Sequence, residues 1–257
     1  MKGSSIAVPD EGGSRTAIAK AFPISIDTAP YLELAAREDV RARAAEIRAS
    51  LGNPKRILLG VDRLDYTKGI GHRIKAYGEL LEDGRLDVED VTLIQVASPS
   101  RERVDAYAHL RDEIELAVAR INGDHDTVGH SAIRYLHQGY PREEMVALYL
   151  AADVMLVTAL RDGMNLVAKE YVATRTGQPA ASSCSASSPA RRTSSARPVR
   201  VNPHDIAGLK GRDHGGGGDV PRRAGAAHAL PPPPVLDNDV NAWSSSFLDA
   251  LADVRRR

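Results

Sequence analysis

Two cations lie in a short polar stretch that directly follows an apolar run. Arg63 and Lys68 occur in GVDRLDYTKGI, just past the run RILLGV, and Gly69 follows them. An arginine offers a fork of hydrogen-bond donors, a lysine offers a compact positive charge, and a glycine lets the backbone approach a ligand closely. These residues could hold a diphosphate. Ion pairs to the neighbouring Asp62 and Asp65 would use the same residues, so the stretch alone leaves both interpretations open.

A second arginine occupies the corresponding place after another apolar run. Arg101 follows VTLIQVA within ASPSRERVDAY, where Ser98 or Ser100 could cap a helix that carries Glu102 in its first turn. Turned toward the strand ends, Arg101 would contact a phosphate. Turned toward water, it would be an ordinary arginine of a first helical turn, and the local sequence favours neither.

A third polar turn lies in TALRDGMNLVAKEYV. Asp162 could accept hydrogen bonds from sugar hydroxyls, and the free amides at the start of the helix that follows could bind an anion. Glu170, two turns into that helix, could reach a ribose. The alternative is structural: Asp162 and Asn165 would be helix caps, and Glu170 would be a surface residue.

The elements that must position these residues alternate between short apolar runs and amphipathic stretches. We expect helices at 31–52, 69–83, 101–122, 142–152 and 165–173, and strands at 56–61, 91–97, 133–138 and 154–159. Apolar strands separated by helices are typical of a parallel sheet covered on both faces, where ligands bind outside the carboxyl ends of the strands. The pattern therefore predicts an α/β fold with all three polar turns at one edge.

The composition restricts the classes of partner. The formal net charge is zero, and no apolar run reaches the roughly 18 to 20 residues of a membrane span, so we expect neither nucleic acid nor a membrane as partner. A single cysteine, Cys184, and an amino terminus without the apolar core of a secretion signal favour a cytoplasmic protein. Glycine-rich dinucleotide and P-loop motifs are absent from the sequence, and the histidines match no metal-binding spacing.

In this order, the stretches resemble the carboxyl-terminal half of the trehalose-6-phosphate synthase family. The similarity runs from AFPISID to about Ala173 and rests on RLDYTKGI, SPSRERV, RINGDHDTVGHSAIRYLH and VMLVTALRDGMNLVAKEYV. It implies a retaining glycosyltransferase with the GT-B fold, of which this chain forms the carboxyl-terminal Rossmann-like domain. It further implies glucosyl transfer from UDP-glucose to glucose 6-phosphate, which gives trehalose 6-phosphate and UDP, without a metal or cofactor. The full-length family also allows a homo-oligomer.

The same resemblance implies roles for individual residues. Arg63 and Lys68 would bind the donor diphosphate and Asp162 would hold the transferring glucose, so these three form the expected catalytic group. Arg101 would contact the acceptor phosphate, and Tyr140 would lie by the uracil. The donor site would continue over Gly163, Met164, Asn165, Leu166, Val167, Ala168, Lys169 and Glu170, the last of them on the ribose.

The chain departs from the family pattern at both ends. We expect residues 1–30 to be a remnant of the interdomain region, with the family's amino-terminal domain absent, and residues 31–175 to form the donor-binding domain. Residues 176–200 are rich in Ser, Ala, Arg and Pro, as in a disordered linker. Residues 201–257 would be a frayed end with a terminal helix at 240–253.

A shifted reading frame is another explanation for the linker. Suitable codons for 182–198, read two bases later, give VLLSEFAGAADELGPA, the strand and motif with which the family continues. Codons for 211–234 can likewise be chosen so that a one-base offset replaces the Gly and Pro runs with helix formers. We therefore hypothesise paired frameshifts, in the gene or in its sequencing, with a natural Ser/Arg-rich linker as the alternative.

Three other possibilities compete with an active enzyme. A UDP-sugar-binding fragment without catalytic activity would bind UDP but would not release it from UDP-glucose when glucose 6-phosphate is added. A fragment that does not fold would show no cooperative thermal transition. A different glycosyltransferase of the same two-domain class would differ in its acceptor.

Overall fold

A parallel six-stranded sheet forms the centre of the molecule. The computed structural model describes residues 4–10, 13–176, 182–186, 199–210 and 234–255. The strand order in the sheet is β5-β4-β3-β6-β7-β8. The strands are β3 (Arg56–Arg63), β4 (Val91–Ser98), β5 (Ile133–Leu136), β6 (Val154–Val157), β7 (Ser182–Ala186) and β8 (Val199–Val201). The expected α/β class with a parallel sheet is confirmed.

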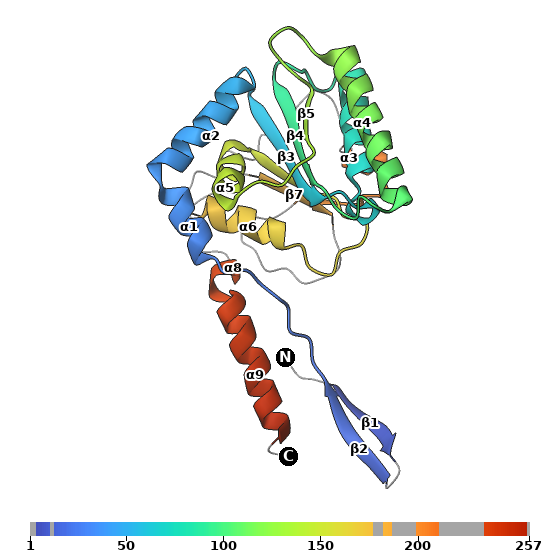
Figure 1. The fold of residues 1–257 in the computed structure, drawn as a ribbon, viewed down its shortest axis with the longest axis vertical. Coiled ribbons are helices and arrows are strands. Elements are labelled where there is room, and N and C mark those ends of the chain that lie inside the picture. Colours follow the sequence, from blue (N-terminus) through green and yellow to red (C-terminus); the bar gives the residue numbers. More distant parts are fainter. Residues whose placement is uncertain (1–3, 11–12, 177–181, 187–198, 211–233, 256–257) are drawn as a thin grey trace.

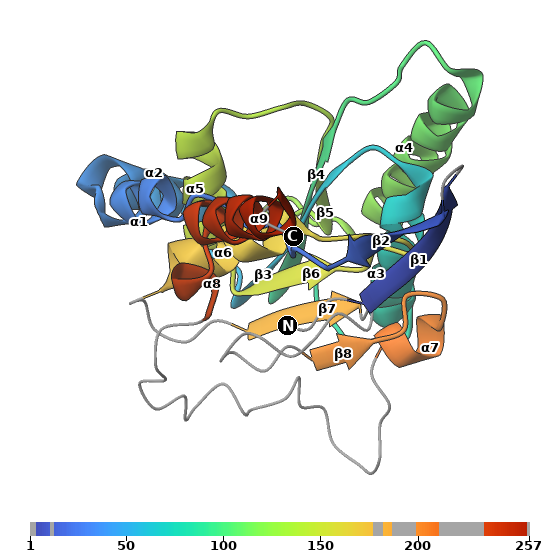
Figure 2. The same cartoon turned by 90° about the horizontal axis from the view of Figure 1, so that it is seen from below.

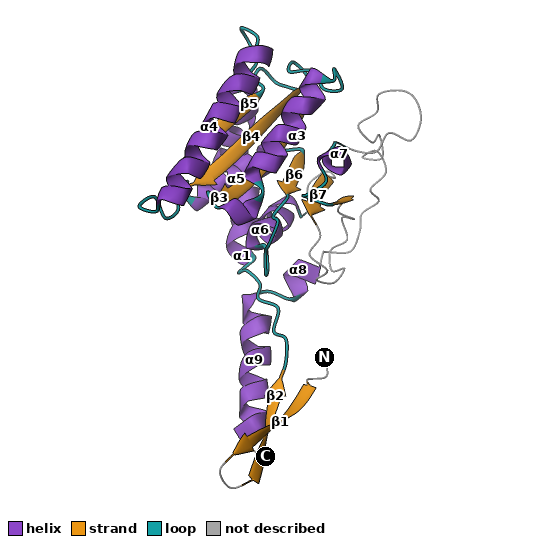
Figure 3. Ribbon diagram, turned by 90° about the vertical axis from the view of Figure 1, so that its right-hand side faces the viewer, coloured by secondary structure: helices purple, strands orange, loops and turns teal. Residues whose placement is uncertain are grey.

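Helices cover both faces of this sheet (Figure 1). One face carries α1 (Ala29–Ala36), α2 (Glu38–Ser50), α5 (Arg142–Ala151) and α6 (Leu166–Arg175). The other face carries α3 (Ile70–Glu82) and α4 (Asp105–His125), which lie in front of the sheet in Figure 3. The apolar residues form two buried clusters, one between the sheet and each helical layer. Because both faces are covered, β3 and β4 are almost continuously buried and need no polar alternation.

Strand register brings the polar turns to one edge. Arg63, the last residue of β3, is level with Ser98, the last residue of β4, and Gly60 is level with Leu156 in β6. The segments that follow these three strands therefore leave the sheet side by side. This is the edge at which parallel sheets bind ligands.

The chain ends project from this body. A hairpin of β1 (Ser4–Asp10) and β2 (Gly13–Ala19) projects to the same side of the body as α9 (Val240–Arg255), which follows the short α8 (Pro234–Asp237) (Figure 1). Rings of Phe22 and Phe247 meet edge to face with centroids 5.3 Å apart, and the Trp243 indole donates to the Phe22 carbonyl oxygen at 3.0 Å. The terminal helix was predicted, but the hairpin was not, since residues 1–30 showed only one short apolar element.

Several predicted boundaries were wrong. The single helix expected at 31–52 is broken at Arg37, whose extended backbone separates α1 from α2. The helix expected from residue 101 begins at Asp105, after a turn that starts at Arg101 with φ 51°. Its N-cap is Val104 without a side-chain cap, so the predicted capping by Ser98 or Ser100 does not occur.

The sheet continues beyond residue 175. β7 pairs with β6 and β8, and α7 (Ile206–Leu209) contacts α3, as seen from below in Figure 2. The prediction of a disordered linker at 176–200 is therefore wrong for the residues that form β7. Residues 199–200 of that stretch belong to β8, whereas 177–181, 187–198 and nearly all of 211–234 lie outside the described residues.

Candidate functional site

An ion pair joins two of the polar turns predicted to bind a ligand. Lys68 Nζ lies 2.7 Å from Asp162 Oδ2, and the two side chains are only 15% and 20% exposed. Asn165 also donates to Asp162 Oδ2, at 3.3 Å. The suggested pairing of Lys68 with Asp62 or Asp65 does not occur. A cation and a carboxylate from neighbouring strands therefore face the same space at the carboxyl edge.

Backbone contacts hold these two turns against each other. The Thr67 carbonyl oxygen accepts hydrogen bonds from the amides of Leu160 and Arg161, at 2.8 and 3.2 Å. Gly69 has φ 65°, and a Cβ atom there would lie 2.4 Å from the Thr158 carbonyl oxygen. Only glycine fits both the left-handed backbone and this approach. Gly69 therefore has a structural reason to follow Lys68.

A buried arginine ties the strand ends together beneath the site. Arg73 Nη2 lies 2.9 Å from Asp62 Oδ2, and the two side chains are 2% and 3% exposed. Arg73 also donates to Gln95 Oε1 at 2.7 Å and, from Nε, to Thr158 Oγ1 at 3.0 Å. Burial raises the pKa of the Asp62 carboxyl, and the charge of Arg73 opposes that rise. This network links β3, β4 and the residue that follows β6. One of its members, Asp62, directly precedes Arg63.

Arg101 belongs to a polar chain on the neighbouring strand end. Its Nη1 donates to the Tyr107 hydroxyl at 2.8 Å, and that hydroxyl donates to Asp65 Oδ2 at 3.3 Å. Burial acts to raise the pKa of Asp65, but hydrogen bonds from Thr67 and Tyr107 and the charge of Arg63 outweigh it and lower that pKa. Arg101 also has φ 51°, which a side chain of this size rarely adopts. Such strain is commonly retained where a side chain must point at a ligand.

The start of α6 supplies further groups. Asn165 is its N-cap, with Oδ1 accepting from the Ala168 amide at 2.8 Å, as the structural alternative proposed. Asp162 does not cap the helix. Glu170 is half-buried instead of lying on the open surface, and its Oε2 accepts from the Tyr149 hydroxyl at 2.7 Å.

The remaining predicted residues lie at or beside this edge. Arg63 and Gly163 are exposed, whereas Met164, Leu166, Val167 and Ala168 are half-buried around the start of α6. Tyr140 is half-buried in the loop after β5, where its hydroxyl accepts from Gln138. Lys169 is directed elsewhere, because its Nζ donates to the Ile24 carbonyl oxygen at 2.7 Å, and burial lowers its pKa.

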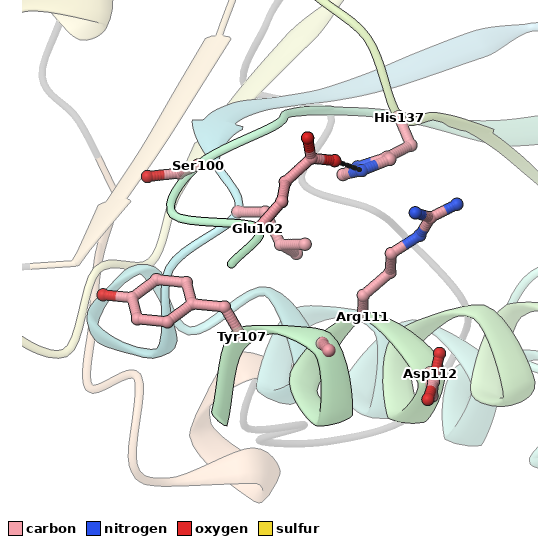
Figure 4. Close-up of a pocket in the computed structure, with 8 residues that line it drawn as sticks. Ser100, Glu102, Tyr107, Arg111, Asp112 and His137 are labelled. Atoms are coloured by element: carbon pink, nitrogen blue, oxygen red, sulfur yellow. Dashed lines mark ion pairs between the residues drawn. The ribbon is translucent and has the colours of Figure 1, made fainter. Parts of the chain in front are cut away.

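A small cavity lies between the segment after β4 and the start of α4 (Figure 4). Its volume is about 110 Å³, and its lining includes Ser100, Glu102, Tyr107, Arg111 and His137. The His137 imidazole lies 3.6 Å from the Glu102 carboxylate, and its Nδ1 contacts the Ala97 carbonyl oxygen at 3.0 Å. The lining carries charges of both signs. The cavity therefore adds further polar groups next to the carboxyl end of β4.

Sequence reasoning did not identify Arg73 or Tyr149 as part of the site. Both lie inside helices that the sequence predicted, but neither residue was assigned a role there. Their type was the available signal, since arginine and tyrosine are rarely buried without a polar partner.

In the described part of the chain, the Asp, Glu, His and Cys side chains form no group of three or more that could hold a metal ion. None of its helices is long and apolar enough to span a membrane.

Comparisons with known proteins agree on one family. The model of glycosyltransferase family 20 matches residues 7–253. Trehalose-6-phosphate synthases from Mycobacterium sp. (strain JLS) and Mycolicibacterium vanbaalenii are 49% and 50% identical, over 95% and 93% of this chain. These alignments cover 50% and 49% of the relatives, so the chain spans about half the length of the curated relatives it matches.

Solved structures show the same relationship. An α,α-trehalose-phosphate synthase (UDP-forming) from Burkholderia xenovorans, in complex with glucose-6-phosphate, has a TM-score of 0.77 and 29% identity, covering 96% of this chain and 56% of that one. A structure from E. coli bound with UDP-2-fluoro glucose has a TM-score of 0.73 and 27% identity, with coverage of 96% and 56%. The expected resemblance is confirmed: this chain belongs to glycosyltransferase family 20.

Proposed function

We propose that this chain carries the donor-binding half of a UDP-forming trehalose-6-phosphate synthase. The proposed reaction transfers glucose from UDP-glucose to glucose 6-phosphate and gives trehalose 6-phosphate and UDP. The observation that carries the proposal is the Lys68–Asp162 pair at the carboxyl edge, between the segments after β3 and β6. Relatives named for this activity and structural neighbours with glucose-6-phosphate and UDP-2-fluoro glucose support it.

Each group at the edge has a chemical task in this reaction. Arg63 and Lys68 bind the diphosphate, on which negative charge grows as the bond to the anomeric carbon breaks. Asp162 accepts hydrogen bonds from the transferring glucose and orients Lys68. Glu170 binds the ribose, Tyr140 lies near the uracil, and the amides at the start of α6 face the donor.

Retention of configuration requires no protein nucleophile here. The acceptor hydroxyl attacks the anomeric carbon from the face that the diphosphate leaves, and its proton passes to the departing phosphate oxygen. Arg101 binds the acceptor phosphate. Preorganised cations stabilise the transition state more than the ground state, which is the condition for catalysis.

A UDP-sugar-binding chain without turnover is the second candidate. The chain spans about half the length of the curated relatives it matches, and the groups assigned at its carboxyl edge, other than Arg101, contact the donor. We also propose that the protein is cytoplasmic and that it forms a homo-oligomer. Gel filtration with light scattering tests the oligomeric state.

Two measurements on the full chain test the function. UDP binding is titrated by calorimetry, and UDP release from UDP-glucose is followed with and without glucose 6-phosphate. Synthase activity requires release that depends on glucose 6-phosphate. Binding without release identifies the second candidate, and the absence of UDP binding contradicts both.

Arg63→Ala provides a specific test, with Arg56→Ala as the matched control. Both arginines are exposed and stand at opposite ends of β3. Only the loss of Arg63 should weaken UDP binding. Equal effects of the two changes would contradict a diphosphate site at the carboxyl edge.

A further inference from the structure

We propose that Tyr149 is a positioning residue for ribose recognition, acting through Glu170. This role rests on the proposed function, because it assumes that Glu170 binds the donor ribose. It concerns a residue in the last turn of α5 that lies outside the motifs considered in the sequence.

The geometry around Glu170 supports this role. Tyr149 is completely buried, and its hydroxyl donates to Glu170 Oε2 at 2.7 Å, across the contact between α5 and α6. Burial and the nearby Glu170 carboxylate raise the pKa of Tyr149, so its hydroxyl keeps the proton that it donates. The hydrogen bond to a carboxylate is charge-assisted and fixes the direction of that side chain.

A second phenol interacts with the same carboxylate. Burial and the Glu170 carboxylate raise the pKa of Tyr31, on α1, to about 12. The Arg142 guanidinium lies 5.5 Å from the centre of the Tyr31 ring. Glu170 therefore interacts with phenols from α1 and α5, and a carboxylate with two oxygens and about four acceptor positions can still bind a ribose hydroxyl.

A neighbouring tyrosine shows that this arrangement is not a general property of the core. The Tyr171 ring meets the Tyr149 ring edge to face, with centroids 6.1 Å apart, and is also buried. Its hydroxyl is buried and has no hydrogen-bond partner among the described residues. Two phenols thus share one packing environment, but only Tyr149 reaches Glu170.

The test compares Tyr149→Phe with the matched control Tyr171→Phe. The affinity of each variant for UDP and for 2′,3′-dideoxy-UDP is measured by calorimetry on the full chain. We expect Tyr149→Phe to weaken UDP binding about tenfold, the loss typical of one charge-assisted hydrogen bond, and to leave binding of the dideoxy nucleotide unchanged. Tyr171→Phe should change neither affinity.

The outcomes separate this role from the proposed function. If the wild-type chain does not bind UDP, the proposed function fails and the role of Tyr149 fails with it. If the wild-type chain binds UDP, an unchanged affinity in Tyr149→Phe, or an equal loss for both nucleotides, overturns the role of Tyr149 alone.

A second variant guards against a change that only loosens the fold. Glu170→Gln keeps the shape of the side chain and removes its charge, so it should lose UDP affinity in the same ribose-dependent way. In this background Tyr149→Phe should cause no further loss of UDP affinity, because the two residues act as one unit. Additive losses would show that Tyr149 acts independently of Glu170 and would overturn the inference.

Discussion

Lys68 Nζ and Asp162 Oδ2 are 2.7 Å apart, although the two residues are 94 positions apart in the chain. The pair joins the segment after β3 to the segment after β6, and both side chains are mostly buried. In the proposed function, one residue meets the diphosphate and the other meets the glucose. The ion pair therefore holds the two donor contacts in a fixed relation before any ligand binds.

Removing the Lys68 charge should reduce function without general damage to the fold. In Lys68→Ala we expect UDP affinity to fall at least tenfold, and any glucosyl transfer to fall on the order of a hundredfold, because a preorganised cation is lost from the leaving group. Lys55→Ala is the matched control, since Lys55 pairs with Asp90 at 2.7 Å near the opposite end of β3 and is 76% exposed. UDP affinity as high in Lys68→Ala as in Lys55→Ala would contradict the assigned role.

A side chain at Gly69 should force the two turns apart. Gly69→Ala places a Cβ atom 2.4 Å from the Thr158 carbonyl oxygen at φ 65°. We expect the free energy of unfolding to fall by about 1–3 kcal/mol, and UDP binding to weaken. Calorimetric unfolding and the UDP titration measure the two effects.

Gly71→Ala is the control for Gly69→Ala. A Cβ atom at Gly71 has no heavy atom within 4 Å, and the residue lies in α3. Alanine there should leave stability unchanged or raise it by up to about 1 kcal/mol, because alanine favours helix. A similar loss of stability in both variants would disprove the special role of Gly69.

The Arg73 network should be important for stability as well as for the site. In Arg73→Met, Asp62 becomes a buried charge without its partner, so we expect the free energy of unfolding to fall by about 3–5 kcal/mol. Adding Asp62→Asn should recover part of this loss, because the uncompensated charge is removed. Denaturant unfolding of the single and double variants measures both effects.

An exposed arginine provides the comparison for Arg73. Arg111 pairs with Glu115 at 2.7 Å on α4, with both side chains at least 40% exposed. Exposed pairs contribute little, so Arg111→Met should cost less than about 1 kcal/mol. A cost as small for Arg73→Met would refute the buried network as a stabilising element.

The lack of Val, Ile and Leu in β7 leads to a prediction about the coding DNA. β7 lies between β6 and β8, and interior strands of parallel sheets are normally rich in Val, Ile and Leu. Its sequence, SSCSA, departs from this, whereas the shifted frame reads VLLSE at the same position. We therefore propose that the resequenced DNA for residues 182–198, read two bases later, encodes VLLSEFAGAADELGPA. Codons incompatible with that peptide would end the frameshift hypothesis.

Local pattern was sufficient for the regular part of the fold. Strands β3 and β4 and helices α3 and α5 lie within about two residues of their predicted bounds, because buried strands and amphipathic helices leave a periodic apolar signal. The same signal failed at Arg37 and Arg101, where a single backbone conformation ends or delays a helix. It also failed at β7, whose residues carry no apolar pattern.

By itself, the sequence determined the α/β class, the alternation of elements and the three polar turns, since these depend on residue type and spacing along the chain. The tertiary structure decided which polar groups meet. Lys68 pairs with Asp162 and not with its neighbours Asp62 and Asp65, Asp62 pairs with Arg73, and Tyr149 reaches Glu170. The physical reason is that strand register and helix packing set the distances between residues far apart in sequence, and hydrogen bonds depend on those distances.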